Sequence, residues 1–420
     1  MPIVNTTTET ISSSGSVTAN RSYLIPFILV TSLFFLWGIA NIMNSALIAH
    51  FQPVFKISRA QALLVETAFY CGYFTIAIPA GLFMEKYSYK KGIILGLFLY
   101  AAGALLFIPA AKLLTFGFFL IALYVIASGL AFLETAANPY VTILGRPETA
   151  IQRINFSQSF NGLALVVGPW IAGQFIFAGN EGAITTLEEK QQAADAVIFP
   201  YVMLAGVVLF VAILFLTIKM PEPGKGAALK FNKAIFKKRH LMLAVLAQMF
   251  YVGGQVGIWG ITLNFVTDLI PGTSNEVASK YYMAAGTVLF VSGRFLGTWF
   301  MTYIKDHKLL ALYGAVVTLL CCVGMFGEGK IAVYALLGTN FFMSIGFPTI
   351  FGLGVRDLGE DTKLGSSLII MSIVGGAVLP PLMGYIAIEH IQMSLIIPAI
   401  SFVVVCFYGL EGYKLKSAKR

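Results

Sequence analysis

Residues 116–143 read FGFFLIALYVIASGLAFLETAANPYVTI and contain one charged residue, Glu134. A helix that crosses the hydrocarbon core of a bilayer needs about 20 consecutive apolar residues, and this run is longer than that. The run therefore predicts a transmembrane helix. Eleven further runs of the same kind extend over about 23–49, 59–85, 91–110, 153–178, 196–219, 241–270, 277–304, 308–328, 331–355, 362–388 and 391–413.

The composition agrees with a chain made of such helices. Of the 420 residues, 58% are hydrophobic and 11% are charged, whereas about a quarter of the residues in a soluble domain are charged. A soluble core cannot absorb this excess of apolar side chains, but lipid can. The sequence predicts an all-α membrane protein with twelve transmembrane helices in two pseudo-symmetric six-helix bundles.

The longest charged interruption lies at residues 220–240 and ends in Lys237-Lys238-Arg239-His240. Six predicted helices precede it and six follow it, as in transporters built from repeated halves. Pro169-x-x-x-Gly173 and Pro380-x-x-x-Gly384, in the fifth and eleventh helices, support a duplicated unit. The predicted parts are a disordered cytoplasmic tail (1–22), an N-terminal bundle (23–219), a cytoplasmic linker (220–240), a C-terminal bundle (241–413) and a second cytoplasmic tail (414–420).

The net charge of +9 does not indicate a nucleic-acid partner, because the charges follow the predicted topology. With both termini inside, 21 of the 28 Lys and Arg residues fall on the cytoplasmic side, six fall outside, and Arg294 falls within a span. This bias obeys the positive-inside rule. We therefore expect a multi-pass protein with both termini in the cytoplasm.

The second largest interruption, residues 179–195, is acidic, and we expect it to form a short surface helix on the outer side. Two dipeptides, Asn138-Pro139 and Gly168-Pro169, lie within predicted helices. Proline removes a backbone hydrogen bond, which a membrane helix tolerates where the break is buried in protein or lines a cavity. Each dipeptide is predicted to break its helix, as a gate or as a kink.

The four cysteines all fall inside predicted spans, at Cys71, Cys321, Cys322 and Cys406. Their spacing matches no metal site, and we interpret them as small buried hydrophobic residues without disulfides. The sequence predicts neither a metal nor an organic cofactor.

Three charged residues lie clearly within predicted spans: Glu66, Glu134 and Arg294. Charges at bilayer depth are costly and are candidates for function. Glu134 could carry a proton or accept hydrogen bonds from sugar hydroxyls, or it could join two helices. Glu66 could handle protons or have a structural role in the outer vestibule. Arg294 is expected to pair with a backbone carbonyl or a helix end, and could act as a gate.

Amide and indole side chains also gather in the spans. An amide offers a donor and an acceptor together, which suits hydroxyl groups, and an indole offers an apolar face to the C–H side of a sugar ring. The mixture predicts a site for a neutral polyol rather than for an anion. These residues are Trp37, Asn41, Asn44, Gln158, Asn161, Gln248, Gln255 and Trp259.

Seven segments, which include several of these residues together with Glu134 and Arg294, resemble the fucose–galactose–glucose:proton symporter family of the major facilitator superfamily. The most specific is Leu133-Glu-Thr-Ala-Ala-Asn-Pro139. The others are Phe34–Asn41, Ala68–Gly81, Gln158–Asn161, Ala247–Gln255, Gly293–Trp299 and Gly359–Ser367.

The resemblance implies two bundles that rock about a central sugar site, proton symport without a cofactor, a monomer, and a bacterial inner membrane. It implies that Glu134 takes part in sugar recognition and proton coupling. It also implies that Trp37, Gln158, Asn161, Gln255 and Trp259 line the cavity.

The chain departs from the family pattern at four positions. Ser45 stands where a close member has a proton-coupling aspartate, Ile42 where it has an asparagine, Phe347 where it has a tyrosine, and Glu66 where it has a glutamine. Ser45 and Glu66 should differ in depth by only about one helical turn. We therefore hypothesise that Glu66 replaces the missing aspartate. The competing interpretation is that coupling is lost and the protein is a uniporter.

The predicted sites follow from these observations. Proton coupling is assigned to Glu134 and Glu66, and gating to Arg294 and to Glu85 and Lys90 at the charged end of the second helix. The substrate-binding residues are Trp37, Asn41, Asn44, Ser45, Glu134, Gln158, Asn161, Gln255, Trp259 and Phe347.

The predicted function is the import of a monosaccharide by a secondary active transporter with alternating access. Fucose, a hexose or an N-acetylhexosamine would fit, and the apolar Ile42 and Phe347 put fucose in doubt. An uncoupled uniporter and a sugar sensor that does not transport remain alternatives. An enzyme is not expected, because the chain has no HExxH, GxSxG or GxxxxGK[ST] motif.

Overall fold

The computed structural model describes residues 21–57, 61, 64–176, 186–221, 233–274 and 277–415, and every regular element in them is a helix. Most of each predicted tail and most of the predicted linker lie outside these residues, as do Arg59 and Glu181. The first helix begins at Arg21, so the predicted N-terminal tail, 1–22, extended slightly too far.

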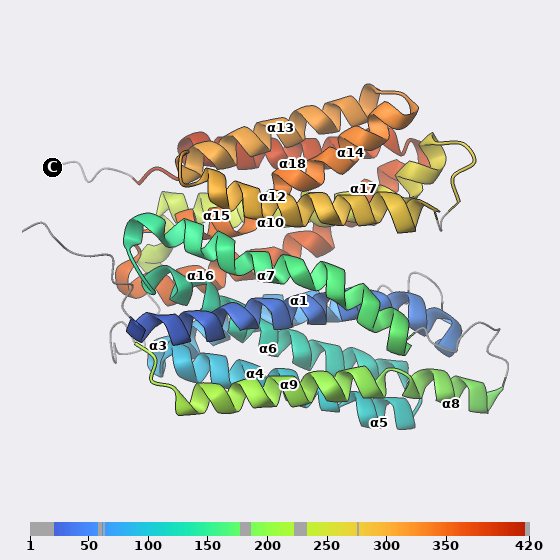
Figure 1. The fold of residues 1–420 in the computed structure, drawn as a ribbon, viewed down its shortest axis with the longest axis horizontal. Coiled ribbons are helices and arrows are strands. Elements are labelled where there is room, and N and C mark those ends of the chain that lie inside the picture. Colours follow the sequence, from blue (N-terminus) through green and yellow to red (C-terminus); the bar gives the residue numbers. More distant parts are fainter. Residues whose placement is uncertain are drawn as a thin grey trace, which may run out of the picture.

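The N-terminal half forms one group of helices, drawn from blue to green in Figure 1. Its elements are α1 (Arg21–Phe55), α3 (Leu64–Lys86), α4 (Tyr89–Leu105), α5 (Phe107–Lys112), α6 (Phe116–Ile143), η1 (Pro147–Thr149), α7 (Ala150–Ile171), η2 (Ala172–Ile176), α8 (Leu187–Asp195) and α9 (Ile198–Thr217).

The C-terminal half forms a second group, drawn from yellow to red in Figure 1. Its elements are η3 (Lys233–Lys237), α10 (Arg239–Leu269), η4 (Ala278–Met283), α12 (Ala284–Phe300), α13 (Asp306–Phe326), α14 (Gly329–Met343), α15 (Gly346–Gly354), η5 (Gly359–Asp361), α16 (Thr362–Met371), η6 (Ser372–Val374), α17 (Gly375–Glu389), η7 (Gln392–Leu395), α18 (Ile396–Phe407) and η8 (Tyr408–Gly412).

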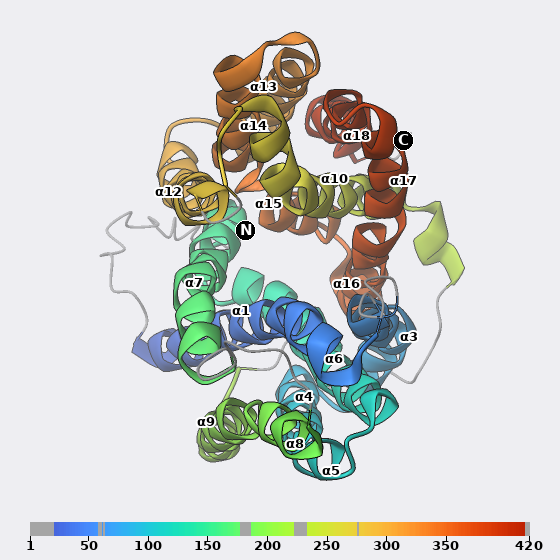
Figure 2. The same cartoon turned by 90° about the vertical axis from the view of Figure 1, so that its right-hand side faces the viewer.

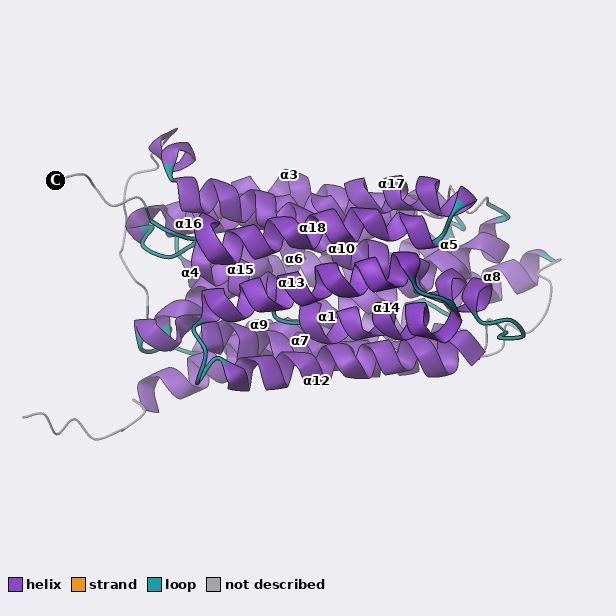
Figure 3. Ribbon diagram, turned by 90° about the horizontal axis from the view of Figure 1, so that it is seen from above, coloured by secondary structure: helices purple, strands orange, loops and turns teal. Residues whose placement is uncertain are grey.

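The two groups pack side by side, as the view along the helices shows (Figure 2). α16 packs against α3 and α6, and α7 packs against α12 and α15. The start of α1 and the end of η8 lie at the same end of the molecule, opposite α5 and α8 (Figures 1 and 3). We call this end the terminal end. A chain that begins and ends on one side crosses an even number of times, which agrees with twelve spans.

Eleven segments of the described chain are long and apolar enough to cross a membrane. The predicted eighth span, 277–304, is not among them, although η4 and α12 form a helix there. Lys280 and Arg294 lower its hydropathy. Every predicted span is therefore represented by a helix, and the all-α membrane fold is confirmed.

The helix interruptions differ from those predicted at proline. α6 continues through Pro139 and α7 through Pro169, so neither proline ends its helix. The tenth span is instead divided into α14 and α15 at Ser344 and Ile345, which the sequence did not reveal. Neighbouring helices can satisfy the backbone groups that proline leaves unpaired, so a membrane helix can bend at proline without stopping.

The acidic segment near residue 190 does form a surface helix, α8. The Thr186 hydroxyl accepts a hydrogen bond from the backbone N–H of Glu189, and the Glu189 carboxylate accepts one from the N–H of Thr186. This reciprocal cap satisfies two free N–H groups at the start of the helix.

The prediction that all four cysteines are buried is wrong for one of them. Cys321 is buried and Cys322 and Cys406 are partly buried, but Cys71 is exposed. All four are free thiols. Cys71 lies beside the exposed Phe74 rather than on the face of α3 that packs on its neighbours. Hydropathy places a residue in a span but does not say whether protein covers it.

Glycine allows α4 and α6 to approach closely. A Cβ atom on Gly129 of α6 would lie 2.5 Å from the carbonyl oxygen of Gly96 and 2.6 Å from the backbone nitrogen of Tyr100, both in α4. Small residues permit such backbone contact between membrane helices. Because the opposing atoms are backbone, they cannot move aside by changing a rotamer.

We expect Gly129→Ala to destabilise the protein by about 1–3 kcal/mol, because the added methyl group overpacks this contact. The measurement is thermal unfolding of the purified protein in detergent. Gly117→Ala, on the same helix, is the matched control because no atom lies within 4 Å of its Cβ position. Equal melting temperatures for the two variants would contradict the proposed contact.

Candidate functional site

Glu134 lies in the middle of α6 and is 4% exposed. The hydroxyl of Tyr73, on α3, donates a hydrogen bond of 2.5 Å to its carboxylate oxygen Oε1. Among the described residues no salt bridge involves Glu134. A buried carboxylate without a cationic partner is costly to keep ionised, which suits a group that binds and releases a proton.

An amide ladder leads from Glu134 to the next helix. The side chain of Asn138, fully buried, donates to the backbone oxygen of Glu134 at 3.0 Å. Gln158 of α7 then donates through Nε2 to Oδ1 of Asn138 at 3.1 Å. Both amides are thus fixed in orientation, and Gln158 is held beside the turn of α6 that carries Glu134.

Arg294 joins the two bundles. It is 3% exposed, and its Nη1 donates to the backbone oxygen of Gln158 at 2.8 Å across the interface. Its Nε donates to the backbone oxygen of Ser344 at 2.7 Å. The guanidinium also lies 4.6 Å from the ring centroid of Phe290. These contacts agree with the expectation that Arg294 pairs with carbonyl groups.

The break between α14 and α15 supplies the carbonyls for this network. Besides Ser344, Met343 accepts a hydrogen bond of 2.7 Å from the hydroxyl of Tyr251 on α10. The side chain of Gln255 donates to that hydroxyl at 3.0 Å. The ring of Tyr251 packs directly on Gly346, where any Cβ atom would overlap it. Polar side chains therefore satisfy the carbonyls that the interrupted helix leaves free.

Trp259 of α10 is held by its indole N–H, which donates to Oδ1 of Asn340 at 2.9 Å. Its ring meets the edge of Phe290 at a centroid distance of 5.3 Å, and the side chain is partly exposed. Phe347, in the first turn of α15, is also partly exposed. These two aromatic residues are available to a ligand, unlike Trp37.

Of the predicted residues on α1, Trp37 and Asn44 are packed inside the protein, each 3% exposed. The ring of Trp37 lies 4.2 Å from that of Phe34, so it acts as core packing in this state. Asn41 and Ser45 are more open, and the hydroxyl of Ser45 donates to the backbone oxygen of Asn41 at 3.4 Å. Among the described residues, no hydrogen bond links these four side chains to the network around Arg294.

Asn161 fixes α7 against α1. Its side chain donates to the backbone oxygen of Phe34 at 3.1 Å. A Cβ atom on Gly38 would lie 2.9 Å from that amide nitrogen, so glycine is needed for the approach. Asn161 remains partly exposed beyond this contact.

Glu66 lies in the first turn of α3 and is partly buried. Tyr70 lies one turn further along α3. Glu66, Tyr70 and Tyr73 occupy positions i, i+4 and i+7, which place them on one face of α3. The two tyrosines are not among the site residues predicted from the sequence, although this spacing indicates a shared face.

The predicted gating residues Glu85 and Lys90 lie at the terminal end. Glu85 is within electrostatic range of Lys363, which begins α16 in the other bundle. Lys90 donates to the backbone oxygens of Leu216 at 3.2 Å and Ile218 at 2.7 Å, at the end of α9 in its own bundle. Glu85 therefore faces the bundle interface, and Lys90 holds the end of α9.

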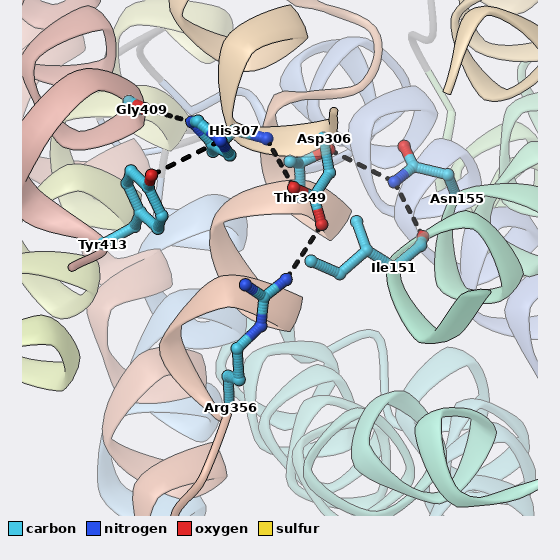
Figure 4. Close-up of polar contacts among 8 residues, drawn as sticks. All are labelled: Ile151, Asn155, Asp306, His307, Thr349, Arg356, Gly409 and Tyr413. Carbon is cyan, nitrogen blue, oxygen red and sulfur yellow. Dashed lines mark hydrogen bonds and ion pairs between the residues drawn. The ribbon is translucent and has the colours of Figure 1, made fainter. Parts of the chain in front are cut away.

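Further hydrogen bonds between the bundles lie in the half nearer the terminal end. The hydroxyl of Ser366 donates to the backbone oxygen of Thr135 at 3.1 Å. Asn155 donates to the hydroxyl of Thr349 at 3.2 Å (Figure 4). Within the C-terminal bundle, Arg356 forms a salt bridge with Asp306 at 2.9 Å.

The comparisons with known proteins agree with this architecture. The model of the Major Facilitator Superfamily matches residues 27–369. The chain belongs to the major facilitator superfamily. It is 40% identical to the L-fucose-proton symporter of Escherichia coli (strain K12), over 93% of each chain. It is 36% identical to the glucose/galactose transporter of Brucella abortus biovar 1 (strain 9-941), over 94% of this chain and 96% of that one.

A solved structure shows the same superfamily fold. The crystal structure of the transporter FucP in the outward conformation matches with a TM-score of 0.84 at 39% identity, over 93% of this chain and 99% of that one. The resemblance to the fucose–galactose–glucose:proton symporter family is thus confirmed. These relatives are transporters, which also bears out the prediction that the protein is not an enzyme.

We expect Arg294→Lys to destabilise the protein by about 1.5–3 kcal/mol, the contribution of a hydrogen bond to a charged group. Lysine keeps the charge but lacks the fork of donors that reaches both carbonyls. The measurement is thermal unfolding in detergent, and Arg146→Lys is the control because Arg146 is exposed in a loop. A melting temperature like that of wild type would show that the two carbonyl contacts contribute nothing.

Proposed function

We propose that this protein imports a monosaccharide across the bacterial inner membrane by proton symport with alternating access. The observation that carries the proposal is a set of hydrogen bonds that links the backbone of Glu134 to Gln158 and, through Arg294, to the break between α14 and α15, where Tyr251 binds Gln255. The residue proposed to bind the proton and the amides proposed to bind the sugar on both bundles are thus held in one connected structure.

The chemistry of the site favours a neutral sugar. The charge of Arg294 is engaged by the carbonyls of Gln158 and Ser344, so it does not call for an anionic ligand. The partly exposed Asn161 offers an amide for hydroxyl groups, and Trp259 offers a ring face. The substrate-binding set predicted from the sequence is retained, with Trp37 and Asn44 supporting the site by packing in this state.

The sugar is proposed to be a hexose, fucose or an N-acetylated hexosamine. The relatives are named as transporters of L-fucose and of glucose and galactose, which supports this class. Ile42 packs on Gly168 of α7, where a Cβ atom would lie 2.5 Å from its side chain, and it is proposed to give the site an apolar wall. Together with Phe347, this wall favours a sugar that carries an apolar group, such as the methyl of an N-acetyl substituent.

We propose that protons bind at Glu134 and Glu66. Tyr73, bonded to Glu134, and Tyr70, on the same face of α3 as Glu66, are proposed to supply hydroxyl groups on the route between the two carboxylates. This arrangement supports the hypothesis that Glu66 replaces the acidic group absent at Ser45. A proton could then pass between Glu66 and Glu134 by an exchange of hydrogen bonds along these hydroxyl groups, and neither carboxylate would have to move into lipid.

The proposed topology puts the terminal end, with both chain termini, in the cytoplasm. The positive-inside bias and the shared position of the two described chain ends support it. Glu85, facing Lys363, and Arg294 are proposed to act in gating, and Lys90 to support the gate by anchoring α9. We propose a monomer in contact with lipid, with the proton as the coupling ion and no cofactor.

The function is tested in liposomes that contain a pH-sensitive dye. We would add L-fucose, D-mannose, D-glucose, D-galactose and N-acetylglucosamine in turn, without a membrane potential, and follow the labelled sugar. We expect one or more sugars to enter together with acidification of the interior. Entry without acidification would indicate a uniporter. Binding of a sugar without entry would indicate a sensor.

Replacing either coupling carboxylate separates sugar movement from proton movement. We expect Glu134→Gln and Glu66→Gln each to abolish sugar-driven acidification, because the amide cannot release a proton. Glu66→Gln should still exchange labelled for unlabelled sugar. Glu389→Gln, an exposed control, should behave as wild type. If Glu66→Gln left acidification intact, the hypothesis that Glu66 replaces the aspartate would be wrong.

A further inference from the structure

Gln248 is a buried amide that the proposed site does not use. It lies in α10 and is 0% exposed. Neither Oε1 nor Nε2 has a hydrogen-bond partner within the described part of the chain. Buried polar groups in native proteins are nearly always bonded, and an amide with both ends unpaired needs an explanation. The same side chain stood out in the sequence as an amide at membrane depth.

The position of Gln248 follows from its neighbours on α10. Tyr251, three residues later, packs on Gly346 of α15, and Ala244, four residues earlier, packs on Gly354 of α15 at 2.6 Å from its Cβ position. Gln248 therefore lies between these contacts, against the middle of α15. Seven residues separate it from Gln255, which places it about 10 Å closer to the terminal end.

α15 covers this amide from the side of the other bundle. On its opposite face, Thr349 accepts the hydrogen bond of Asn155, and Ile151 packs on Gly352 at 2.7 Å from its Cβ position (Figure 4). Asn155 is also 0% exposed, and its Oδ1 has no partner among the described residues. A short helix thus separates two buried amides that each have unpaired polar atoms and that come from different bundles.

We infer that Gln248 and Asn155 form a second sugar subsite, on the cytoplasmic side of the Glu134–Gln255 network, which α15 covers in this state. The inference rests on the proposed function and names the groups that the sugar meets when the site opens inward. A two-residue turn at Ser344 and Ile345 joins α15 to α14, and the inference requires α15 to move away from α10 and α7 when the site opens inward. Its displacement leaves two uncharged amides facing the passage.

The chemistry of the subsite matches that of the site around the Glu134–Gln255 network. Each amide supplies a donor and an acceptor, and together they suit the hydroxyl groups of a neutral sugar. The unpaired atoms are a cost in the state described and are satisfied in the state that opens to the cytoplasm. A transporter with alternating access passes through both the state described here and the state open to the cytoplasm. A residue can therefore be buried without a partner in the first state and bind the sugar in the second.

The test compares the two sides of the membrane. Gln248→Met and Gln248→Leu keep the volume and remove the amide, and Asn155→Leu removes the opposite amide. Uptake of radiolabelled L-fucose and D-glucose is measured in right-side-out and inside-out membrane vesicles. We expect KM for the cytoplasmic side to rise about tenfold, the effect of one lost hydrogen bond, while KM for the outer side stays unchanged. Gln255→Leu is the contrasting variant and should raise KM on the outer side.

A structural role predicts a different result. If Gln248 is a tolerated unpaired amide, Gln248→Leu should raise the melting temperature and leave KM on both sides unchanged, which would overturn the inference. If the wild-type protein moves neither sugar from either side, nor any other sugar of the liposome panel, the proposed function itself fails.

A second measurement does not depend on the folding of the apolar variants. Gln248→Cys is labelled with a small thiol reagent in inside-out vesicles, with wild type as the background for the four native cysteines. We expect labelling that saturating L-fucose or D-glucose slows. An unreactive cysteine at this position, in a protein that still transports, would contradict the inference.

Discussion

One buried cation, Arg294, joins the two bundles of this transporter at membrane depth, together with the hydrogen bonds of Ser366 and Asn155. Arg294 donates to a carbonyl of α7 in one bundle and to a carbonyl at the helix break in its own bundle. A buried guanidinium without partners is strongly unfavourable, so the position of the break and the approach of α7 are both constrained by it. Gln158 accepts a hydrogen bond from this cation through its backbone oxygen, and Gln255 is linked to it through Tyr251 and the carbonyls of Met343 and Ser344.

This constraint explains why an interrupted helix is stable at membrane depth. A gap in a helix leaves carbonyl oxygens that lipid cannot satisfy. Here Tyr251 and Arg294 supply the donors, and Gly346 provides room for the tyrosine ring. The break then separates α15 from α14, and α15 fills the space between the bundles on the side where they are joined. A movement of one bundle against the other would therefore have to break or exchange the bonds that Arg294 makes.

A residue of the candidate site could be predicted from the sequence when its type is rare in a membrane span. Glu134 and Arg294 stand out in apolar runs, and both lie in the cross-bundle network. Trp37 could not be placed in this way, because an indole is as suitable for core packing as for sugar binding, and here it packs on Phe34. Tyr73 and Tyr251 were overlooked because tyrosine is common in spans, and only the atom that its hydroxyl meets gives it a role.

By itself the sequence determined the class of protein, the number and approximate bounds of the helices, and the polar residues from which a site could be built. It did so because a bilayer contains no water, so the spans must be long apolar helices, and each polar or charged side chain within a span is costly and stands out. The tertiary structure decided which of these polar side chains come into contact. Glu134 faces Tyr73, and Arg294 reaches Gln158. α15 lies between Gln248 and Asn155. These contacts join residues far apart in the chain, and they depend on helix rotation and close glycine packing, which hydropathy does not encode.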